Sequence, residues 1–133
     1  MKKVYLDMDG TIANLYTQNN WLERLENEDK TIFLDCKPMT TQETLLKLFP
    51  IDKFEIVILT MTPKNCSIKY HNQVIEQKKQ WLEKFFPMLK KQIFIKYGNN
   101  KNLKNSANAI LIDDNAVIRD NFRGIALNPA NLW

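Results

Sequence analysis

Five short apolar segments recur along the chain, each rich in isoleucine, valine or leucine. They cover residues 4–6, 55–59, 93–95, 109–112 and 124–127. Short, nearly continuous apolar runs of this kind are typical of central parallel strands, which are buried on both faces. The pattern therefore predicts about five strands of a parallel sheet.

Helical periodicity separates these segments. Residues 70–85 show the clearest pattern, at steps of three and four residues, and Pro87 follows its end. The recurring positions are Tyr70, Val74, Lys78, Trp81, Leu82 and Phe85. Residues 41–49 and 115–122 predict two further helices. Strands that alternate with helices predict an α/β fold built on a doubly wound sheet.

Residues 13–39 interrupt this alternation after the first strand. An amphipathic stretch around Trp21 is followed by an acidic turn at 26–29 and a short apolar piece at 31–34. The segment is too short to be an independent domain. We therefore expect a single domain over residues 1–133, with a small helical cap insertion that overhangs the carboxyl ends of the strands and acts as a lid.

Composition narrows the class of protein. The chain has 133 residues, of which 44% are apolar and 26% charged, as in an ordinary globular domain with one sizeable core. Its net charge of +4 fits an anionic substrate but is too small to indicate nucleic-acid binding. The apolar stretch after Lys3 breaks at Asp7, which argues against a signal peptide, and no run is long enough to span a membrane.

The cysteines and the histidine set further limits. Cys36 and Cys66 lack metal-site spacing, so we expect reduced thiols and a cytoplasmic location. His71 is the single histidine, which excludes a multi-histidine zinc site. We expect it to be a helix-surface or packing residue.

The first strand ends in the run Asp7-Met8-Asp9-Gly10-Thr11. Because side chains alternate along a strand, Asp7 and Asp9 leave it on the same side. Carboxylates this close repel each other unless a cation neutralises them, and oxygen ligands suit Mg²⁺. A carboxylate is also a competent nucleophile toward phosphorus. The competing interpretation is a solvated strand-to-turn junction.

Later strand ends carry matching groups. The second predicted strand is followed by Thr60 and Thr62, whose hydroxyls could hold a phosphate oxygen or cap a turn. The fourth predicted strand ends in Asp113 and Asp114, which could provide the further carboxylate ligands that a Mg²⁺ site needs.

A loop lysine lies between these two strand ends. Lys101 or Lys104 could offset phosphate charge, although any single lysine in a chain with 19 Lys and Arg is more often a surface residue.

Along the chain, the Asp7–Thr11 run is followed by a threonine at a strand end, a loop lysine and the Asp113-Asp114 pair. This order of motifs resembles that of the haloacid dehalogenase-like (HAD) hydrolase superfamily, over nearly the whole chain. Residues 61–64 (MTPK), 79–86 (KQWLEKFF), 100–101 (NK) and 111–114 (LIDD) resemble the 5'(3')-deoxyribonucleotidase branch. The branch places its lysine in the loop after the third strand, which favours Lys101. Thr60 and Thr62 both stay candidates for its phosphate-binding hydroxyl.

The resemblance implies a Mg²⁺-dependent phosphatase that acts on a small phosphomonoester, in particular a (deoxy)nucleoside monophosphate. Asp7 would attack phosphorus to form an aspartyl-phosphate, and Asp9 would protonate the leaving alcohol and then activate water. Mg²⁺ would be held by Asp7, the main-chain carbonyl of Asp9, and Asp113 or Asp114. Phosphate oxygens would be bound by Thr60 or Thr62, by N–H groups around Gly10 and by Lys101.

Other interpretations stay open. A basic run along the long predicted helix is usually a solvated face, but it could favour a terminal phosphate of a nucleic acid; it comprises Lys78, Lys79, Lys84, Lys90 and Lys91. The fold could also serve as a non-enzymatic phosphate-binding module or, ranked lower, a receiver-type phosphoacceptor. Tyr16, Trp21 and Phe33 form the insertion's own core or stack on a base. A homodimer could close the site.

Overall fold

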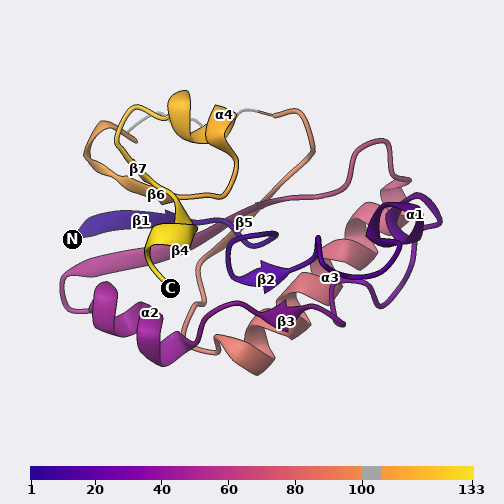
Figure 1. Cartoon of the computed structure of the whole chain (residues 1–133), viewed down its shortest axis with the longest axis horizontal. Coiled ribbons are helices and arrows are strands. Elements are labelled where there is room, and N and C mark those ends of the chain that lie inside the picture. Colours follow the sequence, from indigo (N-terminus) through magenta and orange to yellow (C-terminus); the bar gives the residue numbers. More distant parts are fainter. Residues whose placement is uncertain (100–105) are drawn as a thin grey trace.

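The computed structural model describes residues 1–99 and 106–133. In these residues a five-stranded, wholly parallel sheet has the order β5-β4-β1-β6-β7. The strands are β1 (Lys2–Leu6), β4 (Phe54–Met61), β5 (Gln92–Ile95), β6 (Ile110–Ile112) and β7 (Ile125–Leu127). All five predicted apolar segments are therefore strands of one sheet, and the α/β class is confirmed (Figure 1).

The central strand β1 sets the register. Leu6 lies opposite Ile58 on β4 and opposite Ile112 on β6, and all three are fully buried. The strand that follows β1 in the main sheet, β4, lies on one side of β1, whereas β6 and β7 lie on its other side. The order of the strands therefore reverses between β1 and β6. In open α/β sheets such a reversal creates a crevice at the carboxyl ends of the strands, where ligands bind.

The three predicted helices are also present, each begun by a polar cap. The long one, α3 (Ile68–Phe85), starts where Ser67 Oγ accepts a hydrogen bond from the N–H of Tyr70 at 3.0 Å. Before it, α2 (Gln42–Leu48) is capped by Thr41. Near the C-terminus, Asn115 caps α4 (Ala116–Asp120), which is shorter than the sequence predicted.

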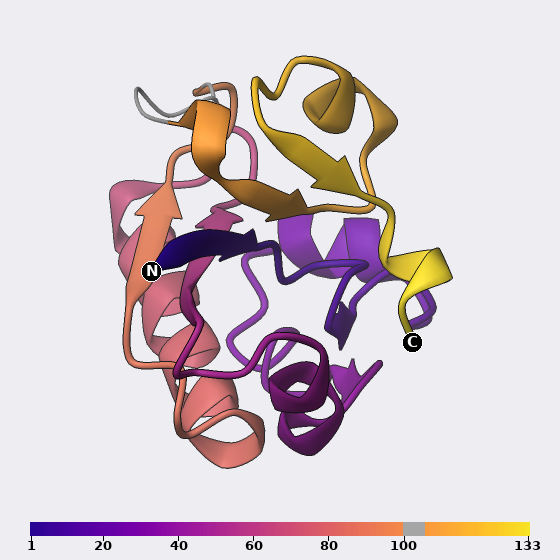
Figure 2. The same cartoon turned by 90° about the vertical axis from the view of Figure 1, so that its left-hand side faces the viewer.

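Helices cover both faces of the sheet, but unequally. Figure 2 shows α2 and α3 on one side and α4 on the other. The side of α3 carries the larger core, in which Trp81, Tyr70 and Leu82 pack against β1 and β4 residues such as Leu6. The smaller core on the side of α4 comprises Tyr5, Val57, Leu59, Ala109, Leu111 and Phe122. The parallel sheet is thus buried on both faces, as its apolar strands require.

The insertion at 13–39 is not purely helical. It holds α1 (Trp21–Glu26) and a two-stranded sheet of β2 (Ala13–Asn14) and β3 (Lys37–Pro38), which the sequence did not predict. Strands of two residues are too short to show a period in the sequence.

Buried and partly buried hydrogen bonds join this insertion to α3. Tyr70 Oη donates to the Asp29 carbonyl at 2.7 Å, and Trp81 Nε1 to the Cys36 carbonyl at 2.8 Å. Between them, the Gln77 side chain accepts from the Phe33 N–H at 2.9 Å. The insertion is therefore fastened along the helix, which makes it a wall of the site in this structure rather than a detached lid.

Both cysteines are free thiols, with Cys36 buried and Cys66 partly exposed. Among the helices of the described residues, none combines the length and the apolar character needed to cross a membrane.

Candidate functional site

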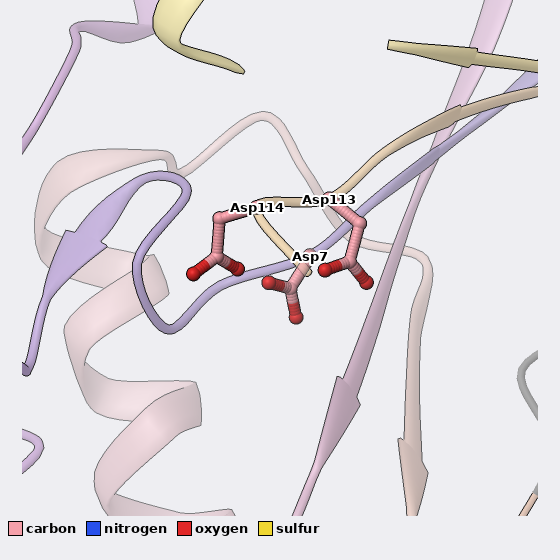
Figure 3. A group of neighbouring side chains, drawn as sticks. All are labelled: Asp7, Asp113 and Asp114. Carbon is pink, nitrogen blue, oxygen red and sulfur yellow. The ribbon is translucent and has the colours of Figure 1, made fainter. Parts of the chain in front are cut away.

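Three carboxylates meet at the crevice between β1 and β6. Asp7 directly follows β1 and its N–H donates to the Ile112 carbonyl at 3.0 Å, so the strand ends stay side by side. Asp113 and Asp114 directly follow β6. Figure 3 shows the three side chains pointing the same way, with Asp7 between the other two. One carboxylate oxygen from each lies within 4.8 Å of the others.

The electrostatics of this cluster favour a cation. Asp7 and Asp113 are buried, while Asp114 keeps contact with solvent. Desolvation, and then the negative charge of Asp7, raise the pKa of Asp114 to about 7. Without a cation, Asp114 therefore binds a proton up to about neutral pH. Hard divalent cations take such oxygen ligands, so the donor set fits Mg²⁺, although other oxygen-seeking cations would fit it too.

Thr11 links the cluster to the loop after β1. It is fully buried, and its hydroxyl donates to Asp7 Oδ2 at 3.0 Å while accepting from the Asp114 N–H at 3.2 Å. On its other side, the Thr11 carbonyl accepts from Trp133 Nε1 at 3.0 Å. Thr11 is the last residue of the run that follows the first strand, where no role was predicted for it. The structure makes it the residue that orients Asp7 relative to Asp114.

Gly10 is required for space and conformation. Its φ of +78° is one that side-chain-bearing residues rarely adopt, and a Cβ there would overlap the Asp114 carboxylate and lie 2.8 Å from the Tyr16 ring. The N–H of Gly10, which the resemblance assigned to phosphate, donates to the Ala13 carbonyl at 2.9 Å. What Gly10 offers the site here is therefore room for Asp114.

Asp9 is not one of the three clustered carboxylates, although it lines the cavity beside them. Its Oδ2 lies 2.9 Å from Nζ of Lys78, a residue of α3. The same ammonium donates to Thr60 Oγ1 at 2.7 Å and to the Met61 carbonyl at 2.8 Å. Lys78 is fully buried, and its three donors each have an acceptor, which is the condition for keeping a charge inside a protein.

The burial of Lys78 corrects its assignment to a solvated face. Its neighbours in the basic run, Lys79, Lys84, Lys90 and Lys91, are exposed as expected. Lys78 differs because it occupies an apolar position of the helical pattern, four residues after Val74 and three before Trp81. That position could have predicted the burial of Lys78 from the sequence. A charged side chain on the apolar face of a helix needs a buried partner of opposite charge or a hydrogen-bond acceptor.

The two candidate threonines occupy different environments. Thr60 is fully buried, its hydroxyl is bound by Lys78, and it is not among the residues that line the cavity beside the cluster. Thr62 does line this cavity, although only 2% of it is exposed. Of the two, Thr62 is thus the one placed to meet a ligand. The other predicted phosphate ligands, Lys101 and Lys104, lie outside the described residues.

A cavity of about 850 Å³ lies beside the carboxylates. The insertion supplies an aromatic and apolar part of its lining that includes Tyr16, Trp21, Leu22 and Leu25. The rings of Tyr16 and Trp21 meet edge to face with centroids 4.9 Å apart. Phe33 also reaches the lining, but it is buried and lies under Lys78 Nζ, 4.8 Å from its ring centroid. Of the three aromatics, Tyr16 and Trp21 are therefore the accessible pair.

Comparison with known proteins adds no assignment to this geometry. No protein-family model matches the chain, and no curated protein matches its sequence.

Proposed function

We propose that this protein is a Mg²⁺-dependent phosphatase of the HAD type, acting on a small phosphomonoester through an aspartyl-phosphate. The observation that carries the proposal is the meeting of Asp7, Asp113 and Asp114 at the carboxyl ends of β1 and β6, beside a cavity of about 850 Å³. A cluster of acids alone is common. Its position at the reversal point of a parallel sheet, on the loop of residues 7–11 that carries the Asp-x-Asp-Gly-Thr (DxDGT) motif, is what favours catalysis.

Asp7, Asp113 and Asp114 would hold the cation, with the main-chain carbonyl of Asp9 as a further ligand. When bound, Mg²⁺ would reduce the repulsion between a carboxylate nucleophile and an anionic phosphate. The Thr11 hydroxyl holds Oδ2 of Asp7 at 3.0 Å. A nucleophile fixed in this way would lose little entropy on reaching its reactive geometry.

The chemistry proposed for Asp7 is a substitution at phosphorus. One carboxylate oxygen forms a bond to phosphorus while the bond from phosphorus to the ester oxygen breaks, and the leaving alcohol takes a proton. Water then attacks the phosphorus of the aspartyl-phosphate, which releases phosphate and restores Asp7.

Asp9 would move the protons in both steps. In the first step its carboxylic acid would give a proton to the leaving alcohol. In the second step the resulting carboxylate would take a proton from the attacking water, which restores the acid form of Asp9 for the next turnover. Lys78 is then a positioning residue, since it fixes Oδ2 of Asp9 from the core side.

The cavity favours a mononucleotide over the end of a nucleic acid. Its volume is within the range of small-molecule sites, and Tyr16 and Trp21 offer aromatic surface to a base. Among the described lining residues, six are acidic and only Lys64 is basic. That balance suits one phosphate at a metal but disfavours the further phosphates of a polynucleotide. A cytoplasmic location belongs to the same proposal.

The test is phosphate release from deoxynucleoside monophosphates, sugar phosphates and a 3'-phosphorylated oligonucleotide, each with Mg²⁺ and with chelator. We expect Mg²⁺-dependent release, fastest from the mononucleotides. Faster release from the oligonucleotide would favour the nucleic-acid alternative. No release from any of them by folded protein that binds Mg²⁺ would favour a non-enzymatic phosphate-binding module.

A further inference from the structure

His71, the single histidine of the chain, lies against a candidate phosphate ligand. Its Nδ1 is 2.8 Å from Oγ1 of Thr62. Thr62 comes directly after β4, and its N–H donates to the Ile95 carbonyl at 2.8 Å, so its backbone is held at the edge of the cavity. His71 is partly exposed in the first turns of α3. His71 therefore has a specific hydrogen-bond partner, and this partner is a nearly buried hydroxyl.

The direction of this hydrogen bond decides what Thr62 can offer a ligand. A hydroxyl has one proton and two lone pairs. If Nδ1 carries a proton and donates, Oγ1 accepts, and the hydroxyl proton is left for a second partner. If Nδ1 is bare, the hydroxyl donates to it and presents only lone pairs elsewhere. An anionic phosphate oxygen is attracted in the first case and repelled in the second.

We propose that His71 is a positioning residue that donates from Nδ1–H to Thr62 and so directs the Thr62 hydroxyl proton toward a phosphate oxygen. The inference rests on the proposed function, because it needs a phosphate group in the cavity. It also separates the two threonines. The Thr60 hydroxyl is bound by Lys78, and Thr60 is not among the residues that line the cavity, whereas Thr62 is.

The experiment measures the dissociation constant of inorganic phosphate by calorimetry in the presence of Mg²⁺. The proteins are wild type, Thr62→Val, His71→Leu, the double variant and His71→Asn. An asparagine amide nitrogen is the same number of bonds from Cβ as Nδ1, so it can replace the donor. Asn72→Leu, at the next and exposed position of α3, is the matched control.

Thr62→Val and His71→Leu should each weaken phosphate binding about tenfold, because each removes the directed hydrogen bond to an anion. The double variant should bind no more weakly than either single variant, since both changes remove one interaction. His71→Asn and Asn72→Leu should bind within about twofold of wild type. A merely structural histidine would not produce this combination of non-additivity and rescue by asparagine.

Three results would overturn the inference: wild-type affinity in His71→Leu, fully additive losses in the double variant, or no phosphate binding by wild type. A different result would show that the proposed function is wrong while the role of His71 stands. In that case phosphate affinity follows the expected pattern, but wild type releases no phosphate from any phosphomonoester in the panel above.

Discussion

Nζ of Lys78 lies 2.9 Å from Oδ2 of Asp9, and this ion pair joins the core side of α3 to the loop that follows β1. The lysine has no solvent exposure, while the Asp9 side chain is 16% exposed. The buried charge is tolerated because Thr60 and Met61 accept the other two ammonium hydrogen bonds. The orientation of Asp9 is therefore set by a helix that lies outside the DxDGT motif.

Replacing Lys78 should affect both stability and activity. Lys78→Met fills most of the volume but leaves Asp9 and the hydroxyl of Thr60 without their shared donor. We expect a loss of about 3 kcal/mol in the free energy of unfolding, because one partner of a buried pair is removed. Phosphatase activity should fall at least a hundredfold, measured on the fraction that urea titration shows to be folded.

Lys79→Met is the matched control, since Lys79 is exposed at the next position. It should change the free energy of unfolding by less than about 0.5 kcal/mol and leave activity intact. Equal effects of the two substitutions would show that the Lys78 ion pair has no special role.

Gly10 and Gly98 allow conformation to be separated from space. Both have positive φ, +78° and +90°, but a Cβ at Gly98 would meet nothing within 4 Å, whereas one at Gly10 would overlap the Asp114 carboxylate. Gly98→Ala should cost about 1 kcal/mol of unfolding free energy from backbone strain alone. Gly10→Ala should cost about 1–3 kcal/mol more, and should also weaken Mg²⁺ binding. Similar losses in urea unfolding, with unchanged Mg²⁺ affinity, would argue against a crowded site.

The raised pKa of Asp114 predicts how stability depends on pH. In the folded protein this pKa is about 7, against an ordinary value of 3.8 when unfolded. Between these values the folded state binds more protons than the unfolded state. Stability of the metal-free protein should therefore fall as pH rises from about 4 to 7. Thermal unfolding in chelator at intervals across that range measures the slope.

Asp114→Asn should flatten that slope, and Asp120→Asn, an exposed change on α4, should not. Mg²⁺ should raise the unfolding temperature of wild type more at pH 8 than at pH 5, because the cation competes with the proton on Asp114. Parallel profiles for wild type and Asp114→Asn would contradict the assignment.

Much of the fold was predictable from the sequence because parallel strands are apolar throughout. Leu6 and Ile112 belong to such runs, and each is followed at once by an acid. Since the carboxyl ends of parallel strands share one edge of the sheet, the meeting of Asp7 and Asp113 could be expected. The α3 helix was predictable from its period and the proline after it.

Other parts of the site depend on tertiary packing. A lysine such as Lys78 is usually exposed, and only its partner Asp9, distant in the sequence, makes burial tolerable. The contact between Thr62 and His71 depends on how closely α3 packs against β4. The hydrogen bonds of Gln77 to the insertion likewise have no local pattern.

The most direct test compares phosphate release from a deoxynucleoside monophosphate by wild type and by Asp7→Asn, each with Mg²⁺ and with chelator. Asp52→Asn, an exposed change, is the control. We expect Mg²⁺-dependent release by wild type and by the control, and none above background by Asp7→Asn. Near-normal release by Asp7→Asn would contradict the assignment of Asp7 as the nucleophile. Release by wild type that persists in chelator would contradict the requirement for Mg²⁺.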